Sequence, residues 1–352
     1  MTEQIKTVYK SESLMAKRIR KFRSIKRGYY SFIIITIGYL ISFLSPFLMN
    51  YKALVISYDD QLYFPVVNYY PSDTFGVDGF GEANYRDLKD EFKAADNGNW
   101  VIMPLYSYGP YESLTDRRSE PPNEPSLQHW FGTDDRGRDV FVRLAYGFNI
   151  SLSFALIYVA ISFLIGISIG ASLGYYGGKL DIYAQRFIEI WAAIPFLYTV
   201  IIISSILKPN FGLLIFVLSL FGWIGMTYFM RGEFYREKAK DYVHAAIAMG
   251  ATDFKVIFKH ILPNSLVPVI TFGPFMIVGA ISSLVALDFL GFGLPPPTAS
   301  WGELVGQGMS NIFSWWLVLF PLLAMAVTLL MVVFIGEAVR QAFDPKEFSR
   351  LR

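Results

Sequence analysis

Residues 241–263 carry the pattern that decides the fold: Asp241-Tyr-Val-His-Ala-Ala-Ile-Ala-Met-Gly-Ala-Thr-Asp-Phe-Lys-Val-Ile-Phe-Lys-His-Ile-Leu-Pro263. The spacing of the apolar residues predicts two short helices hinged at Gly250. One face of the first helix repeats at i, i+3, i+4 and i+7 and consists of Tyr242, Ala245, Ala246 and Met249. This small apolar face permits close approach to another surface. Gly250 is expected to adopt the left-handed conformation that ends many helices.

The second helix is expected to begin after Thr252, whose hydroxyl can cap it, and to end at Pro263. Asp253 is well placed for the helix dipole. The apolar face has the same spacing as before and consists of Phe254, Ile257, Phe258 and Ile261. Periodicity specifies a face but not its partner. An amphipathic hairpin lying on a membrane surface therefore fits as well as a docking element for another protein.

The composition is typical of a polytopic membrane protein. The chain has 352 residues, of which 53% are hydrophobic and 17% aromatic, and the mean hydropathy is +0.38. A net charge of +2 gives no argument for binding nucleic acid. The absence of cysteine excludes disulfides and thiol chemistry, and the three histidines are too scattered to form a motif-spaced metal site.

Six apolar runs are each long enough to cross about 30 Å of hydrocarbon as a helix. They cover residues 31–49, 150–173, 187–207, 211–230, 266–290 and 312–335. The sequence therefore predicts an all-α membrane protein with six transmembrane helices. Its expected parts are a basic N-terminus (1–30), a first span (31–49), an insert with a pre-core segment (50–149), a five-helix core (150–337) containing the loop 231–263, and a tail (338–352).

Basic residues predict the orientation. The loop between the fourth and fifth spans carries Arg231, Arg236, Lys238, Lys240, Lys255 and Lys259. The loop between the third and fourth spans has only Lys208, and the loop between the fifth and sixth has no Lys or Arg. By the positive-inside rule both termini and residues 241–263 are expected in the cytoplasm. The long 50–149 segment is then extracytoplasmic.

Residues 50–128 differ in composition from the rest. A solvated loop is one interpretation, but a small folded subdomain is favoured because the aromatic residues need burial. The next stretch, His129-Trp-Phe-Gly-Thr-Asp-Asp-Arg-Gly-Arg-Asp139, leads into an amphipathic helix. Its carboxylates could bind calcium, but Arg136 and Arg138 would offset their charge, so no metal site is predicted.

No pattern for enzymatic catalysis is present, since Walker A, HExxH, GxSxG and CxxC sequences are all missing. Energy must come from another subunit or from an ion gradient. An ion-coupled carrier would place ionisable groups at mid-membrane, and the spans are nearly free of them. A membrane anchor or receptor built around residues 50–128 is disfavoured by the five further spans. An ATP-driven partner is therefore the favoured interpretation.

The fifth span combines helix breakers with small residues, among them Gly279, Ser282 and Ser283. Such a helix either lines a water-filled path or is a kinked packing helix. Asp288 is the only carboxylate within residues 265–299. It is expected to face protein or water, either as a helix-end residue bonded to its neighbours or as part of an outer gate.

Several motifs, in order, resemble those of binding-protein-dependent ABC importer permeases of the peptide/nickel branch. Ala-Ala, three residues, Gly, and then Ile-Leu-Pro resemble the EAA loop, and residues 129–139 resemble a second signature of that branch. Residues 288–303 match a further segment, as do residues 174–181, Arg186, residues 193–195 and Asp344-Pro345. The long insert, with residues 185–191 and 336–340, is most similar to the Yej subgroup of oligopeptide and microcin C importers.

The resemblance implies a type I importer core in a bacterial inner membrane, formed by the last five spans. It implies a permease subunit that imports peptides or peptide-like compounds. The implied partners are a second homologous permease, ATPase subunits that hold ATP and magnesium, a periplasmic peptide-binding protein and lipid. This chain itself would bind no cofactor and catalyse no reaction.

The resemblance also implies roles for single residues. The ATPase-coupling residues would be His244, Ala245, Ala246, Met249, Gly250, Phe254, Ile257, Leu262 and Pro263. The binding-protein docking candidates are Asp134, Arg136, Arg138 and Trp301, and the gate candidates are Asp288, Gly279, Ser282 and Ser283. His244 departs from the family, which usually has Glu at this position. We expect a less basic ATPase surface opposite it, or a bond from its ring to a backbone carbonyl.

Overall fold

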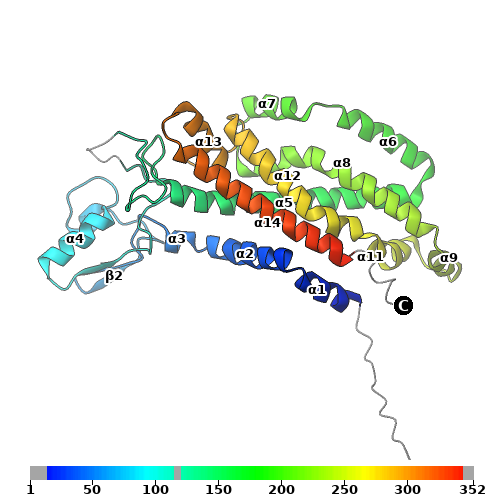
Figure 1. Ribbon diagram of the computed structural model, residues 1–352, viewed down its shortest axis with the longest axis horizontal. Helices are drawn as coiled ribbons and strands as arrows, with labels where there is room; N and C mark the ends of the chain where they lie inside the picture. The colour runs from blue at the N-terminus through cyan, green and yellow to red at the C-terminus, as the bar shows by residue number, and fades with distance from the viewer. Residues whose placement is uncertain (1–13, 115–119, 344–352) are drawn as a thin grey trace, which may run out of the picture.

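The computed structural model describes residues 14–114 and 120–343, so the match at Asp344-Pro345 lies outside the described residues. The helices of the bundle are α1 (Leu14–Ser24), α2 (Lys26–Ser42), α3 (Ser45–Leu48), α5 (Val140–Tyr176), α6 (Gly178–Ala192), α7 (Phe196–Ile206), α8 (Phe211–Lys238), α12 (Val267–Phe289), α13 (Trp301–Ser310) and α14 (Trp316–Phe343). The 241–265 segment forms α9 (Asp241–Ala248), α10 (Asp253–Lys255), a π-helix (Val256–Ile261) and α11 (Leu262–Ser265). Figure 1 shows an elongated molecule with α4 (Tyr85–Ala95) and β2 (Gln61–Tyr63) at one end and α9 at the other.

Within the residues that the structure describes, four helices, α5, α8, α12 and α14, are long and apolar enough to cross a membrane. The predicted span at 187–207 is not one continuous helix, because α6 and α7 are separate helices bent by 67° at a short break. Pro195 stands at the break, as the N-cap residue of α7. The pair counts as a fifth span if it is taken as one broken span. The predicted first span is divided between the 17-residue α2 and the short α3.

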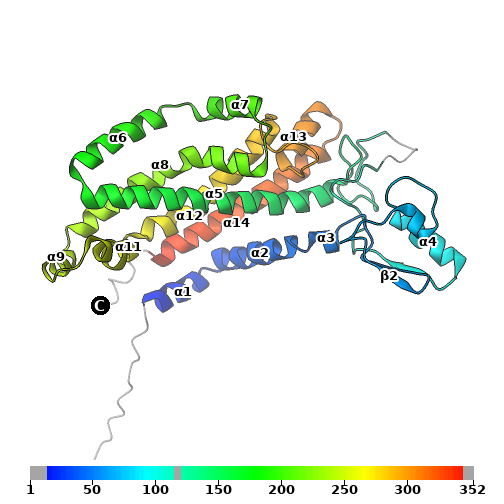
Figure 2. The ribbon, with the colours of Figure 1, turned by 180° about the vertical axis from the view of Figure 1, so that it is seen from behind.

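Helices α5 and α8 pack with their backbones in close contact (Figure 2). Three glycines spaced four residues apart, Gly166, Gly170 and Gly174, line the α5 side of this contact. A Cβ atom added to any of them would lie 2.6 to 2.7 Å from a carbonyl oxygen of α8. Only glycine therefore permits this separation between the two helices.

The insert is a folded unit, as predicted, and not a solvated loop. Strands β1 (Val55–Tyr58), β2 (Gln61–Tyr63) and β3 (Trp100–Ile102) form an antiparallel sheet in the order β2-β1-β3. A 3-10 helix (Ser72–Phe75) and α4 (Tyr85–Ala95) contribute Phe75, Tyr85 and Leu88 to a buried core with Ile56 of the sheet. The chain is thus mostly helical, but its insert adds a small sheet to the predicted all-α fold.

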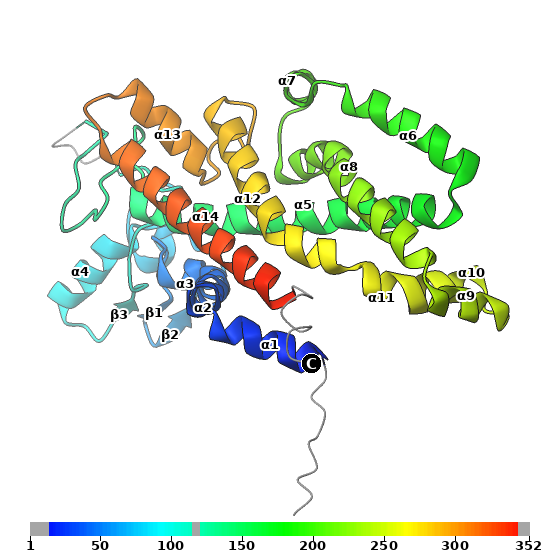
Figure 3. The same ribbon diagram turned by 45° about the vertical axis from the view of Figure 1, so that its right-hand side comes forward.

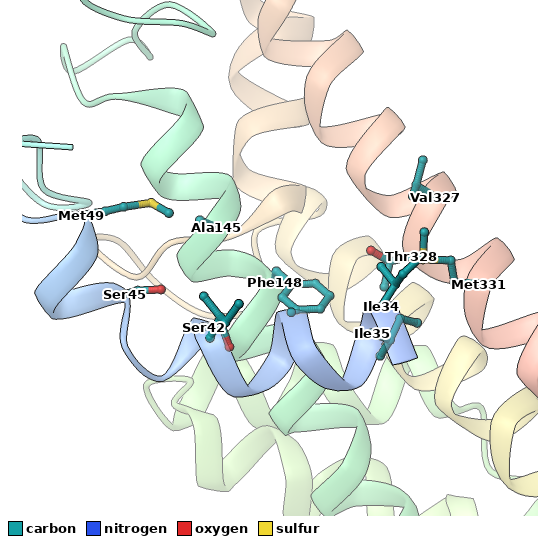
Figure 4. A pocket seen from close by; sticks show the side chains of 12 residues that line it. Ile34, Ile35, Ser42, Ser45, Met49, Ala145, Phe148, Val327, Thr328 and Met331 are labelled. Atoms are coloured by element: carbon teal, nitrogen blue, oxygen red, sulfur yellow. The ribbon is translucent and has the colours of Figure 1, made fainter. Parts of the chain in front are cut away.

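The first helices pack beside the last one (Figure 3). Arg27 of α2 forms an ion pair with Glu337 of α14 at 2.8 Å, and the Arg18 guanidinium lies 4.6 Å from the centroid of the Phe343 ring. Farther along, α2, α5 and α14 line an open apolar pocket of about 310 Å³, with Phe148 and Val327 among the side chains that line it (Figure 4).

Candidate functional site

Helix α9 ends at a left-handed glycine, as predicted. Gly250 has φ +81°. Its N–H donates to the Ile247 carbonyl at 2.9 Å, and the Ala251 N–H donates to the Ala246 carbonyl at 3.0 Å. These bonds satisfy carbonyls that would otherwise be free at the helix end. The chain therefore turns sharply between the two parts of the segment.

The apolar face predicted for α9 is partly buried within the chain and partly exposed. Ala246 is only 3% exposed, whereas Met249 is 82% exposed. Val243, three residues before Ala246, joins the core formed by Met230 and Phe234 of α8. An eight-residue helix has to bury part of its apolar surface to stay in place. Ala246 is therefore not available to another protein, which corrects the prediction for that residue.

The second half of the segment is not the regular helix that was predicted. Thr252 does cap it, accepting from the Lys255 N–H, but α10 passes into a π-helix in which the Leu262 N–H donates to the Ile257 carbonyl. The wider turn buries Val256 and Ile261, five residues apart, at 0% exposure each. Phe254 and Phe258 stay 72% and 52% exposed and pack on each other with centroids 4.5 Å apart.

Pro263 does not end the helix, contrary to the prediction, because α11 contains it. Proline has no backbone N–H, so it is tolerated in the first turn of a helix, where Pro263 stands. Asn264 Nδ2 donates to the His260 carbonyl at 2.9 Å, and the Tyr242 hydroxyl oxygen lies 3.3 Å from the same carbonyl. The same hydroxyl donates to Glu237 Oε2 at 2.8 Å. Burial and this bond raise the pKa of the Tyr242 phenol, which keeps it a donor at neutral pH.

The segment leaves an apolar surface at the end of the molecule, which we call the distal patch. It consists of Tyr242, Ile247, Met249, Phe254 and Phe258, each at least 38% exposed. His244, Ala245, Gly250 and Pro263 are also exposed, whereas Ile257 and Leu262 are half-buried. The His244 ring makes no hydrogen bond to any residue that the structure describes. Exposed patches of this kind mark interaction surfaces.

The opposite end holds a buried ion cluster that sequence reasoning missed. Arg138 contacts Asp134 at 2.6 Å and Glu303 at 3.0 Å. Arg143 contacts Glu303 and lies 3.4 Å from Asp134. Two positive and two negative groups thus balance each other. The only signal in the sequence for this cluster was the presence of charged residues at the boundaries of apolar runs.

This cluster corrects the predicted docking residues. Asp134 and Arg138 are 0% and 2% exposed, and Trp301 is 2% exposed with its indole N–H bonded to the Leu144 carbonyl. They hold the fold together, so only Arg136 is available at the surface. Asp139 accepts from the Tyr106 hydroxyl and caps α5. Within residues 14–114 and 120–343 no group of His, Asp and Glu residues could hold a metal ion.

The gate candidates on α12 have different environments. Gly279 and Ser282, three residues apart, are both exposed, whereas Ser283 is half-buried. Asp288 is bonded within the chain: Oδ1 accepts from the Leu294 N–H at 2.6 Å and Oδ2 from the Ser300 hydroxyl at 2.5 Å. Its geometry matches the helix-end alternative, in which it fixes the turn after α12.

Asp288→Asn is expected to lower stability by about 2 kcal/mol, since two hydrogen bonds to a charged group are weakened. The measurement is thermal unfolding of the purified protein, with Ser282→Ala as the control on the same helix. A variant that unfolds like its parent but discriminates between substrates with free and blocked amino groups would contradict this structural role.

Sequence comparison assigns the chain to a family. The model of the binding-protein-dependent transport system inner membrane component matches residues 162–348. The chain is 40% identical to the inner membrane ABC transporter permease protein YejE of Escherichia coli (strain K12), over 94% of this chain and 96% of that protein. It is 38% identical to the peptidoglycan transport system permease protein YejE of Agrobacterium fabrum, over 95% and 93%.

Among solved structures, a chain of the methionine ABC transporter MetNI in inward-facing conformations gives a TM-score of 0.48 at 17% identity, over 57% of this chain and 96% of that chain. This likeness is too weak to add to the assignment. The family match and the two relatives carry it. The chain belongs to the family of binding-protein-dependent transport system inner membrane components, and it is the permease subunit of an ABC transporter, in which ATP hydrolysis takes place on a separate subunit.

Proposed function

We propose that the chain is one of two permease subunits of an importer for peptides or peptide-like compounds. Relatives of this chain are named as dipeptide and oligopeptide permeases, in Bacillus subtilis at 37% identity and in Haemophilus influenzae at 38%. Residues 129–139 and the exposed small face of α12 fit the same assignment. A periplasmic binding protein would deliver the substrate, and Arg136 is the surface residue proposed to meet it.

The proposed topology has six spans and two cytoplasmic termini. Helices α2 and α3 follow each other within residues 26–48 and would together form the first span. The bent α6–α7 pair would form the third. The basic residues of the 231–259 stretch lie at the end opposite the insert (Figure 1). This arrangement favours an extracytoplasmic insert and a cytoplasmic distal patch.

The observation that carries the proposal is the distal patch itself. Met249, Phe254 and Phe258 are large apolar side chains left exposed on a segment whose other side is firmly packed. Such side chains gain free energy when they leave water, and a patch of this kind marks a surface for a protein partner or for the membrane. The partner we propose is the ATPase, which would hold ATP and magnesium.

The second permease would cover a different surface. Ile190, Tyr183 and Tyr198 of α6 and α7 are 71%, 72% and 68% exposed, and α6 and α7 arch away from α8 (Figure 2). Lipid alone would also satisfy these side chains. The α6–α7 arch is nonetheless a candidate subunit contact, because a bent pair with few neighbours in its own chain gains support from a second subunit.

Purification in mild detergent tests the whole proposal. The chain should elute with a second permease and an ATPase, and the complex should hydrolyse ATP faster when loaded peptide-binding protein is added. If the chain elutes without a second permease or an ATPase, and its transport depends on an ion gradient and not on ATP, the protein is an ion-coupled carrier.

Gly250→Asp is expected to weaken ATPase association about tenfold or more, because an unpaired charge would be buried at the interface. A Cβ atom at Gly250 would meet no atom of this chain within 4 Å, so the defect would come from the partner. Gly250→Asn is the matched control, because Asn also tolerates positive φ but carries no charge. Equal binding by Gly250→Asp and the parent would show that the hinge is not at the ATPase contact.

A further inference from the structure

A hydrogen bond between residues far apart in the sequence fixes the second half of the 241–265 segment to α5. The Tyr175 hydroxyl donates to Asp253 Oδ1 at 2.6 Å. Tyr175 is the penultimate residue of α5 and is 5% exposed, while Asp253 is the first residue of α10. The bond therefore holds the start of α10, directly after the Gly250 turn.

Tyr175 is in turn held by α8. Lys238, the last residue of α8, donates to the Tyr175 carbonyl, and its ammonium lies 5.0 Å from the centroid of the Tyr175 ring. At the same end Arg231 of α8 binds Asp181 of α6 with two hydrogen bonds, at 2.5 and 2.6 Å. The Lys238 contacts and the glycine contacts along α5 hold α5 and α8 together, and the Arg231–Asp181 bonds attach α6 to α8.

Tyr242 makes a second link of the same kind. Its hydroxyl donates to Glu237 near the end of α8 at 2.8 Å and lies 3.3 Å from the His260 carbonyl in the π-helix. Both halves of the 241–265 segment are thus tied to α5 or α8. Helix α12 meets the segment through apolar packing, with Val269 and Phe272 against the buried cluster that contains Val256. Within residues 120–343 no side-chain hydrogen bond joins residues 241–261 to α12.

We propose that Tyr175 and Asp253 are positioning residues that transmit the movement of the docked ATPase to the α5–α8 pair. The inference rests on the proposed function, since it requires an ATPase at the distal patch. With the bond in place, a force on the patch moves α5 and α8 together with the 241–265 segment. Without it, the same force is absorbed by rotation at the Gly250 turn. Loss of the bond therefore uncouples hydrolysis from transport and leaves docking intact.

Spin labels can test this directly, because the chain contains no cysteine. We would label Ser172→Cys on α5 and Lys255→Cys on α10, both exposed positions, in the assembled transporter. In the parent, the distance between the labels should stay narrowly distributed before and after ATP addition. In Tyr175→Phe it should broaden on ATP addition.

A functional measurement accompanies the distances. Trialanine, delivered by its binding protein, serves as the transport probe in proteoliposomes. Tyr175→Phe should lower trialanine transported per ATP hydrolysed by about tenfold, as loss of a hydrogen bond to a charged group implies. Tyr176→Phe is the matched control, since Tyr176 is the next residue, is 55% exposed and should behave like the parent. Combining Tyr175→Phe with Asp253→Ala should add little to Asp253→Ala alone, because both remove the same bond.

Three results would count against the proposal. An unchanged distance distribution with unchanged transport per ATP would show that the bond transmits nothing. Release of the ATPase by Tyr175→Phe would place Tyr175 in docking itself and overturn the positioning role. A parent chain that binds no ATPase would refute the proposed function and with it the inference, whereas the first two results leave that function standing.

Discussion

Arg143→Met should destabilise the protein by about 3–5 kcal/mol, because it leaves buried carboxylates without compensation. Arg143 is 0% exposed and contacts Glu303 and Asp134. It also donates to the Pro110 carbonyl at 3.0 Å and to the Thr298 carbonyl at 3.1 Å. A single guanidinium therefore joins the insert, α5 and the segment before α13.

The measurement is the unfolding midpoint of the purified chain, together with the amount of folded protein recovered from membranes. Arg136→Met is the control, because Arg136 is half exposed and lies 3.9 Å from the partly exposed Asp135. Surface pairs of this kind contribute at most about 1 kcal/mol. If both variants unfold at the same midpoint, the buried cluster does not stabilise this end of the molecule.

Gly170→Val should separate α5 from α8 and prevent recovery of folded protein. Even the first added carbon would lie 2.6 Å from the Thr227 carbonyl oxygen and 2.8 Å from Met230 Cβ. Overpacking of a close contact costs about 1–3 kcal/mol, and more where backbone has to move. A branched side chain at this position meets backbone on the facing helix.

Gly232→Ala on α8 is the matched control, since a Cβ there meets no atom within 4 Å and the residue is exposed. Alanine is a better helix former than glycine by up to about 1 kcal/mol, so this change should be neutral or stabilising. Recovery and unfolding of both variants would be compared in the same detergent. Normal stability of Gly170→Val would mean that α5 and α8 are not closely packed in the membrane.

The sequence by itself determined the features that local patterns encode. Long apolar runs predicted α5, α8, α12 and α14, because a helix that crosses the membrane must carry apolar side chains along its length. The left-handed stop at Gly250 and the cap at Thr252 were also predictable, because both depend on one residue and its neighbours. The aromatic content of residues 50–128 predicted a folded insert, because aromatic side chains need burial.

Tertiary structure decided the rest. Periodicity placed Ala246 and Ile261 on apolar faces but could not say what covers those faces. Packing against the chain's own core buried both residues, and the π-helix changed which residues share a face. The contact between Arg143 and Glu303 joins positions 160 residues apart, and the Tyr175–Asp253 bond joins positions 78 apart. No local pattern specifies such pairs. They depend on how α5 packs against its neighbours, because only that packing brings the charged ends of distant segments within hydrogen-bond reach and out of water.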